Sequence, residues 1–425
     1  MTLAVSTYAQ MNIECVGKAT QVVNKNDTLF FFASQIELRS KIGKANWYST
    51  QTGTLVQSEA EYFYPDEGGY YIVKDGVEYS PFYVFVCRTE ELTMTVETAC
   101  DQTLLNLSGD ATPYTYIRRN GTKGTYERMC TIDYNALAWN TEQWADSAAQ
   151  VTLALAPTLR LPALYGKTPV KLCCDAELRD ALELAPECIT VEVPEEDIRA
   201  VKLNLTKLAA ARENDPDGNN ELERPTEQDF NTSMSYSGAM EVAFYSNPTP
   251  AVQFYQWTIY KATERIATRT DKDIRYIFSE PGSYRVVCTV NNSYCVADSS
   301  EIQVNISESY LAVPNFFSPG GSCRNSEFRV AYRSLREFHC WVYNRWGKLV
   351  YEWTDPSKGW DGTINGQLAA DGAYFYVIRA LGTDAGKYAQ YTSKASYQKK
   401  KLNADESVIG VYQLSGDINL IRCRK

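Results

Sequence analysis

The chain is 425 residues long, with a formal net charge of −10, 12 cysteines and a single histidine. The acidic balance argues against a nucleic-acid-binding protein, which needs concentrated Lys and Arg, and no apolar run is long enough for a transmembrane helix. The 30 tyrosines, 24 glycines and 16 prolines, set among β-branched and aromatic runs, predict an all-β chain of about three or four small β-sandwich modules.

Residues 1–10 resemble the remnant of a secretory signal peptide, because a short apolar stretch leads to a small-residue site near Ala9. An ordinary N-terminal extension is the alternative, but the cysteine count favours secretion. Residues 11–90 then predict an immunoglobulin-like module. Its expected strands are Thr28–Phe32, Asn46–Ser49 and Phe82–Val86, which are rich in aromatic and β-branched residues.

An internal repeat relates this module to residues 231–308. Tyr62–Val73 and Tyr276–Val287 share the pattern Tyr-x-aromatic-x-acidic-x-Gly-x-Tyr-x-aliphatic-Val, and each follows a tryptophan, Trp47 or Trp257. The second copy is similar to a PKD domain, an immunoglobulin-like sandwich. The residues expected in its core and turn are Trp257, Tyr276, Gly282 and Tyr284, the last with its hydroxyl bonded back to the turn.

Residues 91–198 predict a second β-sandwich module between the two copies. Strands are expected at Leu92–Val96, Leu153–Leu161 and Cys188–Val193, and short helices at Ala145–Leu155 or Ala176–Leu184. Trp139 and Trp144 suggest a platform for stacking on sugar rings, although aromatic residues more often fill sandwich cores and edge pairs.

Residues 199–230 predict an acidic linker region, since they contain few large apolar side chains that a core would need. Asp215, Asp217, Asn219 and Glu221 alternate as oxygen ligands do in a calcium loop, but the full spacing of such a loop is absent. A solvated acidic loop is the preferred interpretation. No metal site and no cofactor are expected.

Two disulfides are expected from the positions of the cysteines. Cys288 and Cys295 flank a predicted turn between paired strands, and Cys15 and Cys87 would span the first module as an inter-sheet bridge does in immunoglobulin domains. Five cysteines between residues 100 and 188 and three more after residue 320 allow several other pairings, which stay open.

Residues 309–425 predict a final small β-sandwich. The apolar runs Phe338–Tyr343 and Lys348–Trp353 flank Asn344-Arg345-Trp346-Gly347, and this arrangement predicts a hairpin. Two further strands are expected, Ala373–Arg379 after an Asp-Gly turn and Asp417–Arg422.

This region resembles the type B sorting domain of the Bacteroidetes type IX secretion system, also called the gliding-motility-associated C-terminal domain. The matches run in the order of that family's lead-in, NRWG, WDG, GxYxY and final Arg. They are Pro314, Asn315, Phe317, Ser318, Pro319, Asn344, Arg345, Trp346, Gly347, Trp360, Asp361, Gly362, Gly372, Tyr374, Tyr376 and Arg422. Gly320–Cys323 replaces the acidic turn of the family, so no cation is expected there.

The resemblance implies a secreted, outer-membrane-attached or extracellular protein whose C-terminal domain acts as an export and retention signal. Its implied partners are the type IX translocon and an outer-membrane protein that retains type B cargo. The signature side chains are expected to be architectural, with Trp346 and Trp360 packed as core. The folded domain as a whole, rather than chemistry at these residues, would be recognised as the export and retention signal.

No catalytic constellation is visible, because the only histidine, His339, lies within a strand pattern and lacks a recognisable nucleophile motif. The front modules therefore predict an adhesin or structural surface component, with a host or cell-surface glycan or protein as ligand. The alternative is a carbohydrate-active enzyme or carbohydrate-binding protein with its site in residues 88–200. A deep acidic cleft there would favour the enzyme, since glycosidases need two carboxylates.

Overall fold

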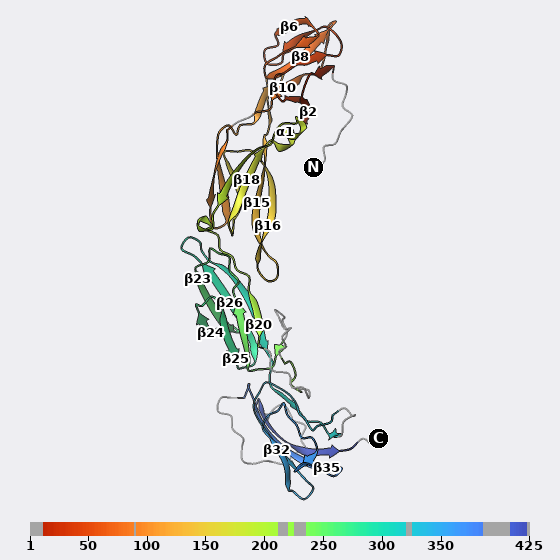
Figure 1. The fold of residues 1–425 in the computed structure, drawn as a ribbon, viewed down its shortest axis with the longest axis vertical. Coiled ribbons are helices and arrows are strands. Elements are labelled where there is room, and N and C mark those ends of the chain that lie inside the picture. The colour runs from red at the N-terminus through yellow and green to blue at the C-terminus, as the bar shows by residue number, and fades with distance from the viewer. Residues whose placement is uncertain are drawn as a thin grey trace. The chain divides into compact units, whose positions relative to one another are not determined.

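The structure, a computed structural model, describes residues 12–88, 91–210, 220–224, 235–319, 325–385 and 409–422, and it is almost entirely β (Figure 1). The chain divides into two compact units. The front unit runs to Val201 and includes Thr249–Ala251 and Tyr294–Val296, and the remainder forms the rear unit. Within the described residues, no helix has the length and apolar character needed to cross a bilayer.

The front unit begins with a seven-stranded sheet and a three-stranded sheet. The larger one has the order β2-β3-β10-β8-β5-β6, with β9 on β8, and the smaller one the order β1-β4-β7. The strands are β1 (Ile13–Cys15), β2 (Ala19–Asn24), β3 (Asp27–Phe32), β4 (Leu38–Ser40), β5 (Ala45–Ser49), β6 (Leu55–Ala60), β7 (Tyr62–Phe63), β8 (Gly68–Lys74), β9 (Val77–Glu78) and β10 (Phe82–Val86).

The rest of the front unit contains three sheets and a short helix. The sheet orders are β11-β12-β17, β13-β14 and β16-β15-β18-β19, and Figure 1 shows β15 and β16 as one long hairpin. The elements are β11 (Thr93–Thr98), β12 (Gln102–Ser108), β13 (Tyr114–Ile117), β14 (Lys123–Tyr126), β15 (Met129–Trp139), β16 (Trp144–Ala154), β17 (Thr158–Pro162), β18 (Thr168–Cys174), α1 (Ala176–Ala181), β19 (Glu187–Val193) and η1 (Glu195–Asp197).

Strands β3 and β10 are buried on both faces, which explains why they are continuous apolar runs instead of alternating ones. They pair in parallel, with Phe85 opposite Phe31. Their alternate residues pack into two separate clusters, one with Trp47 between the first two sheets and one with Tyr114 and Leu178. The first set is Phe30, Phe32, Phe82 and Val84, and the second is Leu29, Phe31, Tyr83 and Phe85. This second cluster joins the first two predicted modules into one unit.

Two expected elements of the middle region are wrong, and one helix is confirmed. Ala145–Leu155 is not a helix but nearly all of β16, which pairs with β15 along its full length and therefore overrides the helix propensity of its alanines. Leu153–Leu161 is two strands of different sheets, because the chain leaves the sheet of β15 and β16 after Ala154 and joins β12 in another sheet at Thr158. The helix expected at Ala176–Leu184 is present as α1.

The rear unit begins with two sheets around a single core that contains Trp257. Their orders are β20-β22-β25 and β21-β27-β26-β23-β24, and Trp257 is fully buried with its Nε1 donating to the Asp271 carbonyl at 3.0 Å. The strands are β20 (Thr206–Ala209), β21 (Ser235–Tyr236), β22 (Met240–Tyr245), β23 (Phe254–Lys261), β24 (Glu264–Arg269), β25 (Ile274–Phe278), β26 (Gly282–Asn291) and β27 (Asp298–Ile306).

The rear unit continues with a five-stranded sheet of order β29-β36-β35-β31-β32 and two short antiparallel pairs, β28-β30 and β33-β34. The strands are β28 (Tyr310–Ala312), β29 (Phe316–Phe317), β30 (Ala331–Arg333), β31 (Leu335–Tyr343), β32 (Leu349–Trp353), β33 (Thr363–Ile364), β34 (Gln367–Leu368), β35 (Gly372–Gly382) and β36 (Val411–Leu420).

A tyrosine corner is present at three Gly-x-Tyr sequences within the described residues. At these three positions the tyrosine hydroxyl donates to the carbonyl of the residue four positions earlier, which fastens the turn to the start of the next strand. The pairs are Tyr70 with Asp66 at 3.1 Å, Tyr284 with Glu280 at 2.7 Å and Tyr374 with Ala370 at 2.9 Å. The third pair lies outside the two repeats detected in the sequence and shows that the same device also shapes the five-stranded sheet.

Both expected disulfides are wrong. Cys288 is fully buried on β26 opposite Ser300, and burial raises the pKa of its thiol to about 12, whereas Cys295 lies beyond the strand and bonds to Cys100. Cys15 packs with the core between the first two sheets, whereas Cys87 belongs to the cluster on the opposite face of β10. The sheet therefore separates Cys15 from Cys87, and both are free thiols.

The second disulfide joins neighbouring strands, Cys173 of β18 to the directly opposite Cys188 of β19. Cys323 and Cys423 lie outside the described residues. So do residues 1–10, with the expected signal remnant, and Asp215, Asp217 and Asn219 of the calcium-like pattern. Glu221 is described, and its carboxylate accepts a hydrogen bond from Ser237 at 2.7 Å.

An ion pair is buried where α1 meets β15. The side chains of Arg128 and Asp175 are 1% and 4% exposed, and Nε lies 2.8 Å from Oδ2. A second nitrogen of the guanidinium donates to the Asp110 carbonyl at 2.9 Å. Replacing Arg128 would therefore leave a buried carboxylate without this donor and the Asp110 carbonyl without its guanidinium partner.

We expect Arg128→Met to lower the free energy of unfolding of the front unit by about 3–5 kcal/mol, since it leaves a buried charge uncompensated. Urea denaturation of the full chain, with hydrogen exchange of the β15 and β18 amides as the local readout, measures this. The control is Lys18→Met, which breaks an ion pair to Glu183 whose side chains are 59% and 77% exposed and which should therefore have a much smaller effect. Equal effects of the two substitutions would contradict the prediction.

Candidate docking surface

Trp360 is the central core residue of the five-stranded sheet region. Its indole is fully buried, with ring centroids 5.4 Å from Phe317 and 4.9 Å from Tyr374, and its Nε1 donates to the Thr363 carbonyl at 2.7 Å. Its backbone exchanges two hydrogen bonds with Phe328. The lead-in, WDG and GxYxY segments therefore meet on one side chain.

The turns of this region are fixed by side-chain oxygens and by glycines. Asn344 Oδ1 accepts hydrogen bonds from the backbone N–H groups of Trp346 and Lys348, both at 3.0 Å, and Gly347 adopts a left-handed φ of 75°. Asp361 Oδ1 accepts from the backbone N–H of Thr363 at 2.9 Å in the same way. These signature residues are architectural because they set the direction of the chain.

Close packing also constrains Gly362. Its φ is 76°, and a Cβ placed there would lie 2.9 Å from Pro319 Cγ. Any side chain at Gly362 would push the lead-in away from the WDG turn.

The lead-in and the last described strand are joined directly. Phe317 lies opposite Leu420 in a parallel pair, and the Ser318 hydroxyl donates to the Ile421 carbonyl at 2.6 Å. Arg422 then forms an ion pair with Asp371 and donates to the Ala369 carbonyl. Arg422 therefore fastens the turn that precedes β35.

Trp346 does not pack in the core as expected. It lies in the turn between β31 and β32 with 76% of its surface exposed, because Asn344 and Gly347 direct the turn away from the sheet. Arg345 stacks its guanidinium over the indole, 4.6 Å from the ring centroid. An aromatic ring exposed to this extent contributes little to the core of the domain.

A groove of about 520 Å³ lies beside this turn and crosses β31, β35 and β36. Its side chains come from outward positions of the sheet: Tyr343 on β31, Phe375 and Val377 on β35, and Gln413 and Ser415 on β36. Two cationic side chains, Arg345 and Arg379, also line it, and none of the described residues in its lining is a carboxylate.

Sequence reasoning missed Tyr343, Phe375 and Val377. The sequence contained a pattern that could have identified them, because β35 carries apolar residues on both faces. Tyr374 and Ile378 point inward and are buried, whereas Phe375 points outward and is 40% exposed. A strand with one solvated face normally carries polar residues at its outward positions, so the outward Phe375 and Val377 are unusual for an open face of a sheet.

The remaining signature residues have structural contacts. The Asn315 carbonyl accepts from the backbone N–H of Asn419 at 3.1 Å, and Pro314 is half-buried beside it. The ring of Tyr376 lies 5.7 Å from that of Phe328, and burial raises the pKa of its hydroxyl.

The single histidine is a sheet residue, as expected. His339 stacks on Trp341 with ring centroids 3.7 Å apart, and its Nε2 lies 3.3 Å from Glu352 Oε2 on the neighbouring strand. In the part of the chain that the structure describes, no three His, Cys, Asp or Glu side chains are grouped closely enough to hold a metal ion.

A groove of about 490 Å³ crosses β15, β16, β18 and β19 in the region proposed for an enzyme site. Its lining includes one carboxylate, Asp133, which accepts a hydrogen bond from Gln150 at 2.7 Å. Trp139 and Trp144, at the end of the same hairpin, lie opposite each other and pack edge to face at 5.5 Å, and so do not form a flat platform.

The two tryptophans of the signature should respond differently to truncation. We expect Trp360→Ala to lower the free energy of unfolding of the rear unit by about 3–5 kcal/mol, because it empties a fully buried site. We expect Trp346→Ala to change it by less than about 0.5 kcal/mol, because that side chain is exposed. Urea denaturation with hydrogen exchange of β35 amides measures both, and a large loss for Trp346→Ala would show that the ring is structural.

Several known solved structures are similar to parts of this chain, all at low identity. A tetra-tandem repeat in the extending region of a large adhesion protein is 10% identical, covering 92% of this chain and 97% of that chain with a TM-score of 0.18. The chicken CNTN1 FN1–FN3 domains are 12% identical (69% and 93% covered, TM-score 0.22), and dimeric latent PorU from Porphyromonas gingivalis is 10% identical (82% and 36% covered, TM-score 0.16). At these scores the similarities carry no argument.

The family models are more informative. No curated protein sequence matches the chain. Residues 93–180 match the fibronectin type III domain, and residues 311–395 match the CHU_C type IX secretion signal domain. Neither is an enzyme family, and a type IX signal implies an interaction with the secretion machinery. The chain is therefore a secreted or cell-surface protein that carries a type IX secretion signal domain over residues 311–395, with a fibronectin type III domain ahead of it.

Proposed function

We propose that the protein is an adhesin or structural component displayed at the cell surface, and that its signal domain docks on an outer-membrane protein that retains it there. The observation that carries the proposal is the exposed Trp346 beside an apolar, arginine-lined groove in a domain of the type IX signal family. The modules before it supply the part that is displayed.

The chemistry of the groove favours an acidic partner segment with apolar side chains. Phe375 and Val377 offer apolar surface, and Arg345 and Arg379 add positive charge to a protein with a net charge of −10. Glu352 and Asp417 occupy the same face of the sheet but do not line the groove. Trp and Arg are also the residues that most often dominate binding energy at protein interfaces.

The turn adds preorganisation to this chemistry. Asn344 and Gly347 fix its backbone, and the stacked Arg345 restricts the indole of Trp346, so little conformational entropy is lost when a partner binds. A binding surface that is rigid before docking suits a signal that must be recognised in many cargo proteins.

The front modules fit display better than catalysis. The groove in the region 88–200 has one carboxylate in its lining where a glycosidase needs two, and the matched fibronectin type III domain is a scaffold on which loops and faces bind ligands. The ligand that we propose is a protein or glycan of a host or neighbouring cell.

Deleting residues 311–425 tests the role of the signal domain. In a host with a type IX system we expect the full chain to be removed from whole cells by protease, and the truncated chain to remain protected in the periplasm. Protease treatment of whole cells against lysed fractions is the measurement. Equal localisation of the two forms would remove the support for an address in this region.

Trp346→Ala tests the docking surface without removing the domain. We expect at least a tenfold loss of surface-exposed protein with unchanged unfolding, since the ring contributes to binding and not to the fold. The matched control is Leu368→Ala, which truncates another exposed apolar side chain of the same domain, 71% exposed, and should leave display unchanged. Normal display of Trp346→Ala would move the docking site elsewhere on the domain.

A further inference from the structure

The Cys100–Cys295 disulfide joins two points that are far apart in the sequence, with a separation of 195 residues. Cys100 lies in the turn between β11 and β12, and Cys295 lies in the segment Tyr294–Val296 that connects β26 to β27. Both cysteines belong to the front unit, although β26 and β27 themselves belong to the rear unit.

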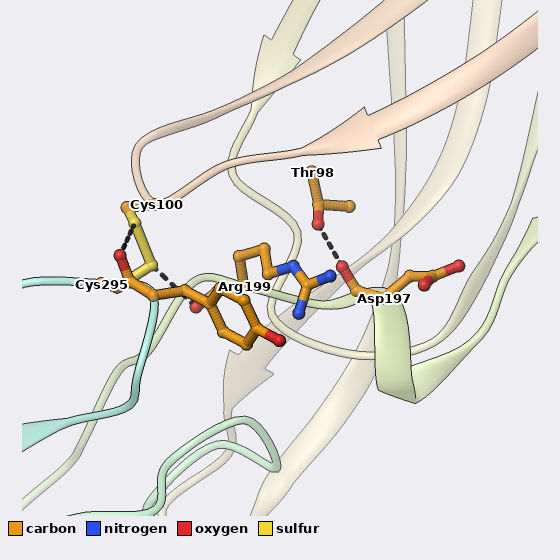
Figure 2. The surroundings of a disulfide bond; sticks show 6 residues. Thr98, Cys100, Asp197, Arg199 and Cys295 are labelled. Atoms are coloured by element: carbon orange, nitrogen blue, oxygen red, sulfur yellow. Dashed lines mark hydrogen bonds between the residues drawn. A yellow bond between two sulfur atoms is a disulfide. The ribbon is translucent and has the colours of Figure 1, made fainter.

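The surroundings hold both ends of this disulfide in place (Figure 2). The guanidinium of Arg199 lies over the ring of Tyr294, 3.8 Å from its centroid, and the Cys295 sulfur lies 2.9 Å from the Arg199 carbonyl oxygen. Two residues before Cys100, the Thr98 hydroxyl donates to the Asp197 carbonyl. The segment that contains Asp197 and Arg199 therefore contacts the residues beside both cysteines.

We propose that this disulfide is a covalent bypass for mechanical load along the chain. Tension applied to the two ends passes from residue 100 to residue 295 through the sulfur atoms, because that path is far shorter than the backbone path. Residues 101–294 are then outside the load path. The bypass follows from the covalent connectivity alone, and only its use under load in the cell rests on the proposed surface function.

The bypassed segment contains most of two β-sandwich modules. It includes β12–β19 of the front unit and β20–β26 of the rear unit, whereas β11 and β27 stay on the load path. Tension can pull β11 from β12 and β27 from β26, but it cannot extend the segment between the cysteines. If a surface protein is pulled between its ligand and its anchor, the segment between the two cysteines would stay unextended even after its modules have lost their native contacts.

Single-molecule force spectroscopy of the full chain, with handles at its two ends, tests this directly. The readout is the contour length of the fully extended chain. We expect the oxidised chain to be shorter than the reduced chain by about 660 Å, which is the separation of 195 residues at about 3.4 Å each.

The Cys100→Ser/Cys295→Ser variant should be longer than the oxidised wild type by about 610 Å. This increase in extended length is smaller than the increase on reduction, because the Cys173–Cys188 bridge remains in the variant. Once the outer bridge is absent, that bridge, with a separation of 15 residues, shortens the extended chain by about 50 Å. The matched control is Cys173→Ser/Cys188→Ser, which should leave the oxidised length unchanged, since its bridge lies inside the bypassed segment. These lengths are measured on unfolded chains, so they do not depend on whether a variant folds.

An extended length that does not change in the Cys100→Ser/Cys295→Ser variant would overturn the proposal. Peptide mapping that finds Cys295 joined to Cys288 would also overturn it, because a bridge over seven residues shortens the extended chain by only about 24 Å. Surface display is measured separately, so normal display of the signal-domain variants together with an intact length difference would overturn the proposed function and leave the bypass standing.

Discussion

The signal domain depends on the packing of Trp360. Its indole contacts Phe317 from the lead-in and Tyr374 from β35. Its backbone N–H and C=O groups both form hydrogen bonds with the backbone of Phe328. Segments that are far apart in the sequence thus share one fully buried ring. Because the core is complete without Trp346, that second tryptophan is available for recognition. The same family signature therefore combines two physical roles, one that builds the domain and one that faces outward.

The front unit also contains strands that are apolar on both faces. β3 and β10 are apolar on both faces, and both faces are covered, so their aromatic residues join two clusters into a single unit. β35 is also apolar on both faces, but its outward residues line an open groove. The comparison separates two arrangements of a doubly apolar strand: β3 and β10 are covered on both faces and lie in the interior, whereas β35 leaves its outward face open.

Much of this fold was predictable from local signals. The strand patterns, the Gly-x-Tyr corners and the hairpin around Asn344 and Gly347 depend on residues close in sequence, and the structure places them as turns and strands. The disulfides and the exposure of Trp346 were not predictable, because they depend on contacts between distant segments. Cys288 sits at a plausible spacing from Cys295, yet its inward position on β26 excludes the pairing. Sequence spacing does not show which face of a sheet a side chain occupies.

The parallel pairing of β29 with β36 has a consequence for the order in which this region folds. Phe317 and Leu420, like Ser318 and Ile421, are 103 positions apart in the sequence, and the Arg422 contacts form in the same step. Contacts over such a separation form slowly, because a long segment of chain must first be closed into a loop. A chain that lacks β36 would leave β35 without one of its two neighbouring strands, so the five-stranded sheet is completed only when this strand joins.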